Sequence, residues 1–150
     1  MTRIADLIHD WNLDQGAFRP ARPLQFDDET LRDGLQSPAV SDPPLETKIE
    51  LIEHMDRLGI HTANLGLPGA GGRPREDILK LAQHIAKNGL RIGANVACRT
   101  VVSDIEPVVE MTQRAGIPIE VCAFIGSSYI RQYAEDWPLE KLLQHTREAL

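Results

Sequence analysis

The residues best placed to do chemistry are concentrated in one short stretch, FDDETLRDGLQ, which occupies residues 26–36. The stretch holds four acids, one arginine and one glutamine. Carboxylates gathered in this way can hold a hard divalent cation through oxygen. An arginine beside them can stabilise a carbonyl oxygen or an enolate as negative charge develops. The same residues are also typical of a solvated turn whose charges only cap the next helix, so both interpretations remain open at this point.

Strands and helices alternate regularly from residue 24 onward. Short apolar segments predict strands at 24–26, 60–67, 90–97 and 117–125, and apolar residues at helical spacing predict helices at 45–58, 74–88, 103–115 and 138–150. The first three helices are each followed by a glycine, which commonly ends a helix: Gly59, Gly89 and Gly116. Ser103 is expected to be the N-cap of the third. The pattern therefore gives four βα units, each of roughly 30 residues.

Two architectures fit these units, a doubly wound sheet or part of a TIM barrel. A doubly wound dinucleotide-binding fold calls for a glycine-rich turn after the first strand, whereas the turn here carries acids and an arginine. We therefore predict an α/β fold in which residues 23–150 form the first four βα units of a (β/α)8 TIM barrel. Residues 1–22 would be an N-terminal lead-in, with a short helix at 4–11. The apolar run at 117–125 predicts a strand covered on both faces.

The length of the chain also bears on this prediction. A closed barrel takes typically about 250 residues, so a chain of 150 residues is expected to be a piece of a longer protein. A half-barrel that dimerises is the alternative.

Composition and charge exclude several classes of protein. The formal net charge is −6 and there is no basic patch, which argues against nucleic acid as a partner. No apolar run approaches the roughly 20 residues that cross a bilayer, and the N-terminus has no secretory signal. Cys98 and Cys122 match no zinc or disulfide pattern and are expected to be small buried apolar residues. These features favour a cytoplasmic protein without a membrane partner.

Residues 28–36, DETLRDGLQ, resemble the D-x-T-L-R-D-G-x-Q signature of the metal-dependent enzymes that condense or cleave acyl-CoA thioesters. This superfamily includes 2-isopropylmalate synthase, homocitrate synthase and hydroxymethylglutaryl-CoA lyase. Residues 66–68 are similar to its G-F-P motif, and residues 124–128 to its F-I-x-[TS]-S motif. The resemblance covers roughly residues 24–150, and the first motif is much the most specific. Leu35, where the synthases usually have glutamate, is more typical of the lyase branch.

The resemblance implies a divalent cation (Mg, Mn or Zn) held by an aspartate after the first strand and by a His-x-His pair near the seventh. By position, Asp33 would be the metal ligand and Arg32 would stabilise the developing oxyanion. Gln36 would line the pocket near the acyl group. A bound metal that polarises a carbonyl typically supplies several kcal/mol of stabilisation, so Asp33 should matter most. The substrates would be an acyl-CoA and a small 2-keto acid, and the full-length enzyme would be a homodimer.

The chain departs from that pattern in two places. It has no His-x-His pair, and we interpret its five histidines as structural: His9, His54, His61, His84 and His145. Asn64 stands where the second strand of the family usually carries glutamate. An amide can hydrogen-bond a substrate but cannot take a proton, so the substrate could differ, the chemistry could be lost, or the register could be misassigned.

Two further residues are candidates for substrate binding. Arg99, after the third strand, could pair with a substrate carboxylate or a CoA phosphate, or be a surface arginine. Ser127, with Ser128, could bind ligand hydroxyls or cap a turn.

The sequence therefore predicts a metal-dependent condensation of an acyl-CoA with a 2-keto acid. Carbon–carbon cleavage of the lyase type is one alternative. The other is a non-catalytic half-barrel or degenerate homologue that only binds a ligand or a partner. The 150-residue chain by itself is expected to be inactive.

Overall fold

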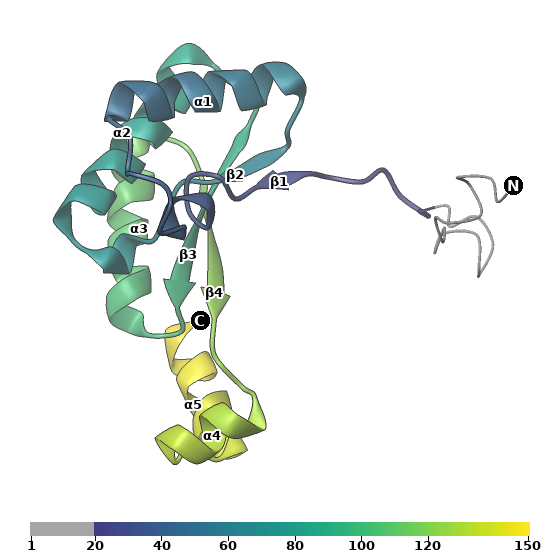
Figure 1. Cartoon of the computed structure of the whole chain (residues 1–150), viewed down its shortest axis with the longest axis vertical. Helices are drawn as coiled ribbons and strands as arrows, with labels where there is room; N and C mark the ends of the chain where they lie inside the picture. The colour runs from purple at the N-terminus through teal and green to yellow at the C-terminus, as the bar shows by residue number, and fades with distance from the viewer. Residues whose placement is uncertain (1–19) are drawn as a thin grey trace, which may run out of the picture.

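The computed structural model describes residues 20–150, so the helix predicted at 4–11 lies outside the described residues (Figure 1). Four parallel strands form one sheet in the order β1-β2-β3-β4: β1 (Asp27–Asp28), β2 (Thr62–Asn64), β3 (Gly93–Arg99) and β4 (Ile119–Phe124). The helices are α1 (Leu45–Leu58), α2 (Gly72–Asn88), α3 (Val102–Ala115), α4 (Tyr129–Glu135) and α5 (Leu139–Ala149). Two short 3-10 turns follow the first two strands: η2 (Gly34–Gln36) and η3 (Pro68–Ala70).

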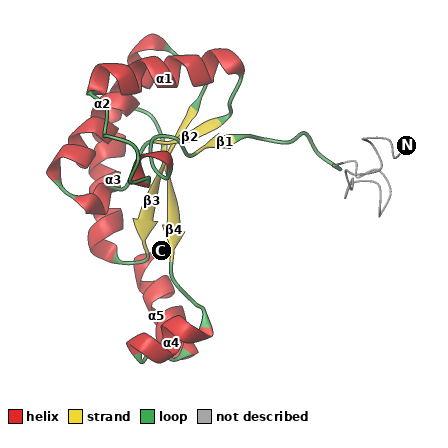
Figure 2. Cartoon of the chain, in the orientation of Figure 1, coloured by secondary structure: helices red, strands yellow, loops and turns green. Residues whose placement is uncertain are grey.

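Strand order distinguishes the two candidate architectures. A doubly wound sheet reverses its strand order and carries helices on both faces. Here the strands follow one another in chain order, and α1, α2 and α3 lie together on one face (Figure 2). This is how consecutive βα units are arranged in a TIM barrel, so the predicted fold is confirmed.

The predicted helix ends agree closely with the structure because the terminating glycines act as expected. Gly59 has φ 80°, a left-handed conformation that L side chains rarely adopt, and its N–H donates to the carbonyls of Asp56 and Met55. Gly89 and Gly116 end α2 and α3 in the same conformation. Helix α1 has the predicted bounds.

Several predicted boundaries were wrong. The first strand is Asp27–Asp28, not residues 24–26, because β2 pairs with Asp27 and Asp28. Val101, not Ser103, precedes α3 as its N-cap; the N–H of Asp104 donates to the carbonyl of Val101, so the first turn begins earlier than predicted. Helix α4 was not predicted. Its N-cap is Ser128, whose hydroxyl accepts a hydrogen bond from the N–H of Arg131.

The fourth strand is not covered on both faces, which corrects a second prediction. Its residues alternate between buried or half-buried positions and exposed ones. Helix α3 packs against one face of β4. The exposed residues are Glu120, Cys122 and Phe124, and no described element covers them. The nearly continuous apolar character of the run therefore concealed an alternating pattern of burial.

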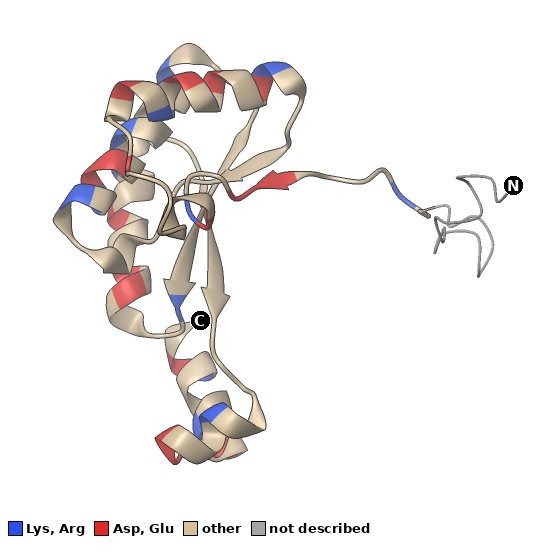
Figure 3. Cartoon of the chain, viewed as in Figure 1, with Lys and Arg blue, Asp and Glu red and all other residues tan. Residues whose placement is uncertain are grey.

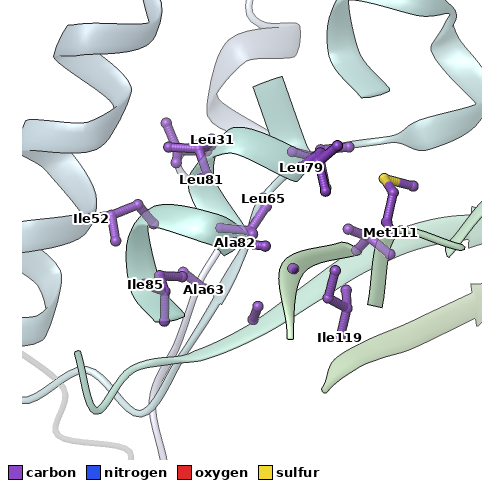
Figure 4. Close-up of a cluster of buried hydrophobic side chains, with 14 of the residues drawn as sticks. Leu31, Ile52, Ala63, Leu65, Leu79, Leu81, Ala82, Ile85, Met111 and Ile119 are labelled. Atoms are coloured by element: carbon purple, nitrogen blue, oxygen red, sulfur yellow. The ribbon is translucent and has the colours of Figure 1, made fainter. Parts of the chain in front are cut away.

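The hydrophobic core lies between the sheet and the helices α1, α2 and α3 (Figure 4). Side chains that are almost fully inaccessible come from both layers, among them Ile52, Leu81, Val96 and Val108. Burying each such side chain contributes roughly 1.5–3 kcal/mol, so this layer holds the strand ends in place. Acidic and basic segments are interspersed along the outer helices (Figure 3). No helix within residues 20–150 combines the length and apolar character needed to cross a membrane.

Candidate functional site

The face of the sheet opposite α1, α2 and α3, here called the inner face, carries most of the polar side chains that could act on a ligand. Alternate residues of a strand share a face, and the parallel register aligns Asn64, Asn95 and Glu120 across three strands. Asp27 on β1 pairs with Thr62 on β2, and Thr62 lies two residues before Asn64, so it shares the face of Asn64. The sheet therefore presents rows of polar groups where barrel interiors place their side chains.

A first polar layer, centred on the carboxylate of Asp27, ties three strands together. The carboxylate of Asp27 accepts hydrogen bonds from the hydroxyl of Thr62 and from the side-chain amide of Asn95, both at 2.6 Å. Asn95 is buried, and its Oδ1 atom has no partner within residues 20–150. These bonds fix the relative position of β1, β2 and β3 below the strand ends.

A second polar layer lies at the strand ends and includes Arg32. Glu29 Oε2 accepts a hydrogen bond from Arg32 Nε at 2.8 Å, and Glu29 Oε1 accepts one from Asn64 Nδ2 at 3.2 Å. These three residues border a cavity of about 250 Å³ whose other walls are Ala97, Cys122, Ala123 and Phe124. Active sites of TIM barrels lie at this end of the strands. The cavity is therefore our candidate functional site.

The chain between β1 and η2 folds into a tight turn that aims Arg32 at the cavity. The carbonyl oxygen of Glu29 accepts three backbone N–H bonds from the residues that follow, at 2.8–3.2 Å. Asp28 Oδ1 accepts a hydrogen bond from the N–H of Thr30 at 2.8 Å, which tightens the entry to the turn. Leu31 points into the core and anchors the turn from below. The motif residues are thus held by both backbone and core contacts.

The structure brings two of the predicted site residues into this cavity. Arg32 is half-buried there, and Asn64 lines the wall with only 1% of its surface exposed. Both polar atoms of the Asn64 side chain are in use, because Oδ1 accepts from the N–H of Gly66 at 3.2 Å. Asp33 lies at the rim with 66% of its side chain exposed, and its carboxylate accepts a hydrogen bond from Arg32 Nη1 at 3.2 Å.

Gln36 lines a neighbouring cavity of about 220 Å³, which also touches Arg32. On its wall the buried Nζ of Lys48 lies 2.7 Å from Asp42 Oδ1 and 2.8 Å from Asp77 Oδ2. Burial acts to lower the pKa of Lys48, but the hydrogen bonds to the two carboxylates outweigh it and the pKa is raised. Lys48 therefore stays charged and joins the loop after Gln36 to α1 and α2.

Arg99 and Ser127 do not border the cavity of Glu29 and Arg32. The guanidinium of Arg99 makes a two-point contact with Asp104, with Nε 2.7 Å and Nη2 2.8 Å from the carboxylate oxygens. This pairing holds the pKa of the buried Asp104 carboxyl below its usual range. Ser127 is exposed, and its carbonyl accepts a hydrogen bond from the side chain of Gln132. In this structure the two residues fix the chain around α3 and α4.

Sequence reasoning missed two residues of the cavity, Glu29 and Cys122. Glu29 occupies the variable position of the motif, although its spacing of two from Asp27 placed it on the inner face. The prediction that Cys122 is buried was wrong, whereas Cys98 is buried as expected. Partial burial of the Cys122 thiol raises its pKa, and nearby carboxylates, first that of Glu120, add to the effect. Cys122 therefore presents a protonated thiol at neutral pH.

A divalent cation at this rim would need several ligands to converge. Within residues 20–150, no three His, Cys, Asp or Glu side chains are arranged so that they could hold a metal ion. Asp33 does present an exposed carboxylate beside Arg32, and hard cations such as Mg²⁺ prefer carboxylate oxygen. The described residues therefore offer such an ion one ligand, Asp33, and do not form a complete metal site.

Comparisons with known proteins show which sequences this chain resembles. The chain is 31% identical to a 2-isopropylmalate synthase of Ruminiclostridium cellulolyticum over 134 residues, which are 86% of this chain and 25% of that protein. It is 35% identical to the homocitrate synthase AksA of Methanothermobacter thermautotrophicus over 83 residues, 55% of this chain and 20% of that protein. A putative (R)-citramalate synthase CimA of Methanoculleus marisnigri is 29% identical over 126 residues, 84% of this chain and 22% of that protein.

The chain spans a quarter or less of the length of these relatives. Residues 23–149 match the HMGL-like family, a range that takes in the whole sheet and the motif at its rim. The chain therefore belongs to the HMGL-like family.

Proposed function

We propose that the protein containing this chain condenses an acyl-CoA with a 2-keto acid, as an acyltransferase. The observation that carries this proposal is the half-buried guanidinium of Arg32, held at the strand ends in a cavity of about 250 Å³. The names of the similar synthases support the same reaction class. In the proposal, residues 23–150 are part of a catalytic barrel and residues 1–22 a lead-in.

Arg32 would stabilise the oxygen on which charge develops. A guanidinium has five N–H donors in a fixed plane, and the hydrogen bonds to Glu29 and Asp33 use two of them. The remaining donors can bind an oxyanion at the carbonyl under attack. Gln36, which lines the cavity next to Arg32, would contact the acyl group. Asn64, Arg99 and Ser127 remain proposed substrate-binding residues.

Asp33 would be one ligand of a divalent cation, with Mg, Mn and Zn as candidates. When bound, such an ion would polarise the keto group of the substrate. Asp33 supports this role because its carboxylate is exposed at the rim and close to Arg32. The other ligands would come from residues outside the described range.

Two features of the chain keep other functions in view. Leu35 is more typical of the lyase branch, so cleavage of a hydroxyacyl-CoA is the second candidate. Asn64 and the incomplete set of metal ligands among residues 20–150 would also suit a homologue that binds without catalysis. We further propose a homodimeric full-length protein in the cytoplasm, where the two unpaired cysteines would stay reduced. Its partners would be small substrates rather than nucleic acid.

The experiment is a thiol-release assay on the protein as its source organism makes it. Acyl-CoA thioesters are combined with a panel of 2-keto acids in the presence of a divalent cation. Free CoA that forms only when both substrates are present is the expected result. Acetyl-CoA formed from a hydroxyacyl-CoA alone would identify a lyase. Absence of turnover in both directions would favour the homologue that binds without catalysis.

Asp33→Ala is the matching test of the metal assignment. We expect this variant to lose metal-dependent turnover and to bind Mn²⁺ more weakly in a calorimetric titration. The control is Glu50→Ala, which removes an exposed carboxylate from α1, a helix on the face of the sheet opposite the cavity. Turnover and Mn²⁺ affinity equal to those of the wild type in Asp33→Ala would refute the assignment.

A further inference from the structure

Among the described residues, Glu29 is the only acid that lines the cavity of about 250 Å³ at the strand ends. Its two oxygens bond partners on different elements, one bonding Arg32 in the turn after β1 and the other bonding Asn64 on β2. We infer that Glu29 is the residue that positions Arg32, and that Asn64 is an amide because it must donate to this carboxylate. The inference rests on the proposed function and adds a positioning residue to it.

The contacts of Arg32 favour Glu29 over Asp33 as the group that orients the guanidinium. Glu29 bonds Nε at 2.8 Å, while Asp33 bonds Nη1 at 3.2 Å. The Glu29 side chain is 40% exposed and that of Asp33 is 66% exposed, so water competes more strongly for Asp33. A bond to Nε restricts rotation of the guanidinium plane and leaves the outer edge of the group for a ligand. Glu29 therefore decides where the remaining donors of Arg32 point.

The orientation of the Asn64 amide follows from a backbone contact. Asn64 Oδ1 accepts a hydrogen bond from the N–H of Gly66, so Nδ2 must be the atom that faces Glu29. Nδ2 lies 3.2 Å from Glu29 Oε1, a distance at which two carboxylates could not both stay charged without strong repulsion. The carboxylate that follows β1 and the amide on β2 are thus a matched pair, with one negative charge between them.

Glu29→Gln tests the positioning role directly. The uncharged amide holds Arg32 more weakly, and its NH₂ group must face a donor, either Arg32 Nε or Asn64 Nδ2. We expect kcat to fall about 100-fold, the effect of misplacing a catalytic group by about 1 Å, with KM little changed. Glu110→Gln is the matched control, because it also breaks a carboxylate–guanidinium pair (with Arg114, 3.2 Å) but on the exposed side of α3. Equal kcat values in the two variants would overturn the inference.

Asn64→Asp gives a readout that a merely structural role would not change. Two carboxyl groups at this distance share one proton, so the apparent pKa of the pair rises. The protonated pair resembles Glu29 with Asn64, so activity should be kept at low pH and lost as pH rises through that pKa. The wild type should lack this ionisation. A pH profile of Asn64→Asp that matches the wild type would contradict the inference.

The double variant Glu29→Gln/Asn64→Asp moves the negative charge from the β1 side of the pair to β2 and keeps the number of hydrogen bonds. The amide introduced at position 29 would accept from Arg32 and donate to the carboxylate introduced at position 64, so no shared proton is needed. We expect the extra ionisation to disappear and part of the lost kcat to return. Activity as low as in Glu29→Gln, with the ionisation still present, would refute the matched pair.

The failure of this inference can be distinguished from the failure of the proposed function. Absence of condensation in the wild type would refute the proposed function. Crystal structures of the wild type and of Glu29→Gln would then still test the positioning role. A displaced Arg32 guanidinium in the variant is the expected result, and an unmoved one would overturn the inference whatever the reaction is.

Discussion

Replacing Lys48 with methionine removes the cation that joins the loop after Gln36 to two helices. The side chain of Lys48 is 8% exposed and that of Asp77 is 12% exposed, with 2.8 Å between Nζ and Oδ2. After the substitution Asp77 would keep only Arg73, whose Nε is 4.0 Å away and whose side chain is 62% exposed. The variant therefore leaves a nearly buried carboxylate without a close partner.

The size of the effect follows from these contacts. Removing one partner of a buried ion pair typically costs about 3–5 kcal/mol, because the other charge is left uncompensated. Arg73 still reaches Asp77, and Asp42 is exposed enough for water to replace Lys48, so we expect the lower end, about 3 kcal/mol. The pKa of Lys48 is raised on folding. The contribution is therefore complete below the unfolded pKa of about 10.4, and it is lost only as pH rises through the higher folded value.

Urea unfolding at pH 7 is the assay, with the intact protein and its variants measured side by side. The double variant Lys48→Met/Asp77→Asn removes the stranded charge and should recover much of the lost free energy of unfolding. The reasoning would be refuted if Lys48→Met cost under about 1 kcal/mol, the range of a surface pair. It would equally be refuted if the double variant were no more stable than the single one.

Two further predictions concern the packing and the thiols. Gly69→Ala should cost about 1–3 kcal/mol of stability, because the added Cβ would lie 2.6 Å from Asp104 Oδ2, which Arg99 holds in place. Gly72→Ala, where a Cβ meets nothing within 4 Å, is the control in the same denaturation experiment, and equal stability of the two variants would contradict this account. Iodoacetamide should alkylate Cys122 well before the buried Cys98, whose pKa is raised to about 11. Both reactions should accelerate as pH rises, because the thiolate is the reactive form. Peptide mass spectrometry would measure the labelling of each cysteine, and faster labelling of Cys98 would contradict this prediction. A saturating 2-keto acid should slow the labelling of Cys122, which lines the proposed site.

Local patterns predicted the fold class and four of the five α-helices within residues 20–150, because those features depend on short-range interactions. The glycine after α1 and the apolar spacing within it set its bounds at Leu45 and Leu58. Strand limits were harder, because a strand ends where its neighbour stops pairing, and the partner of β1 lies 35 residues further along the chain. The N-cap of α3 was misassigned for a related reason, since a serine near a helix start is only one of several possible caps.

The same distinction applies to the candidate site, where the sequence predicted some residues and the tertiary structure decided others. The motif at residues 28–36 located Arg32 and Asp33 at a strand end, and Asn64 could be recognised as a departure from the family pattern. Residue types alone could not show that Arg99 is paired with Asp104, because that contact depends on the path of the chain into α3. Cys122 was misjudged because burial depends on which face of β4 is covered.

By itself the sequence determined the order of the elements, the parallel βα architecture and the identity of the motif, since each is encoded in residue type and spacing. Only the tertiary structure placed Glu29 between Arg32 and Asn64. The contact of Glu29 with Asn64 joins residues 35 positions apart, and it exists because the register of β1 against β2 brings them to the same level of the sheet. The electrostatic character of the cavity therefore depends on the pairing of strands and not on any one segment of the chain.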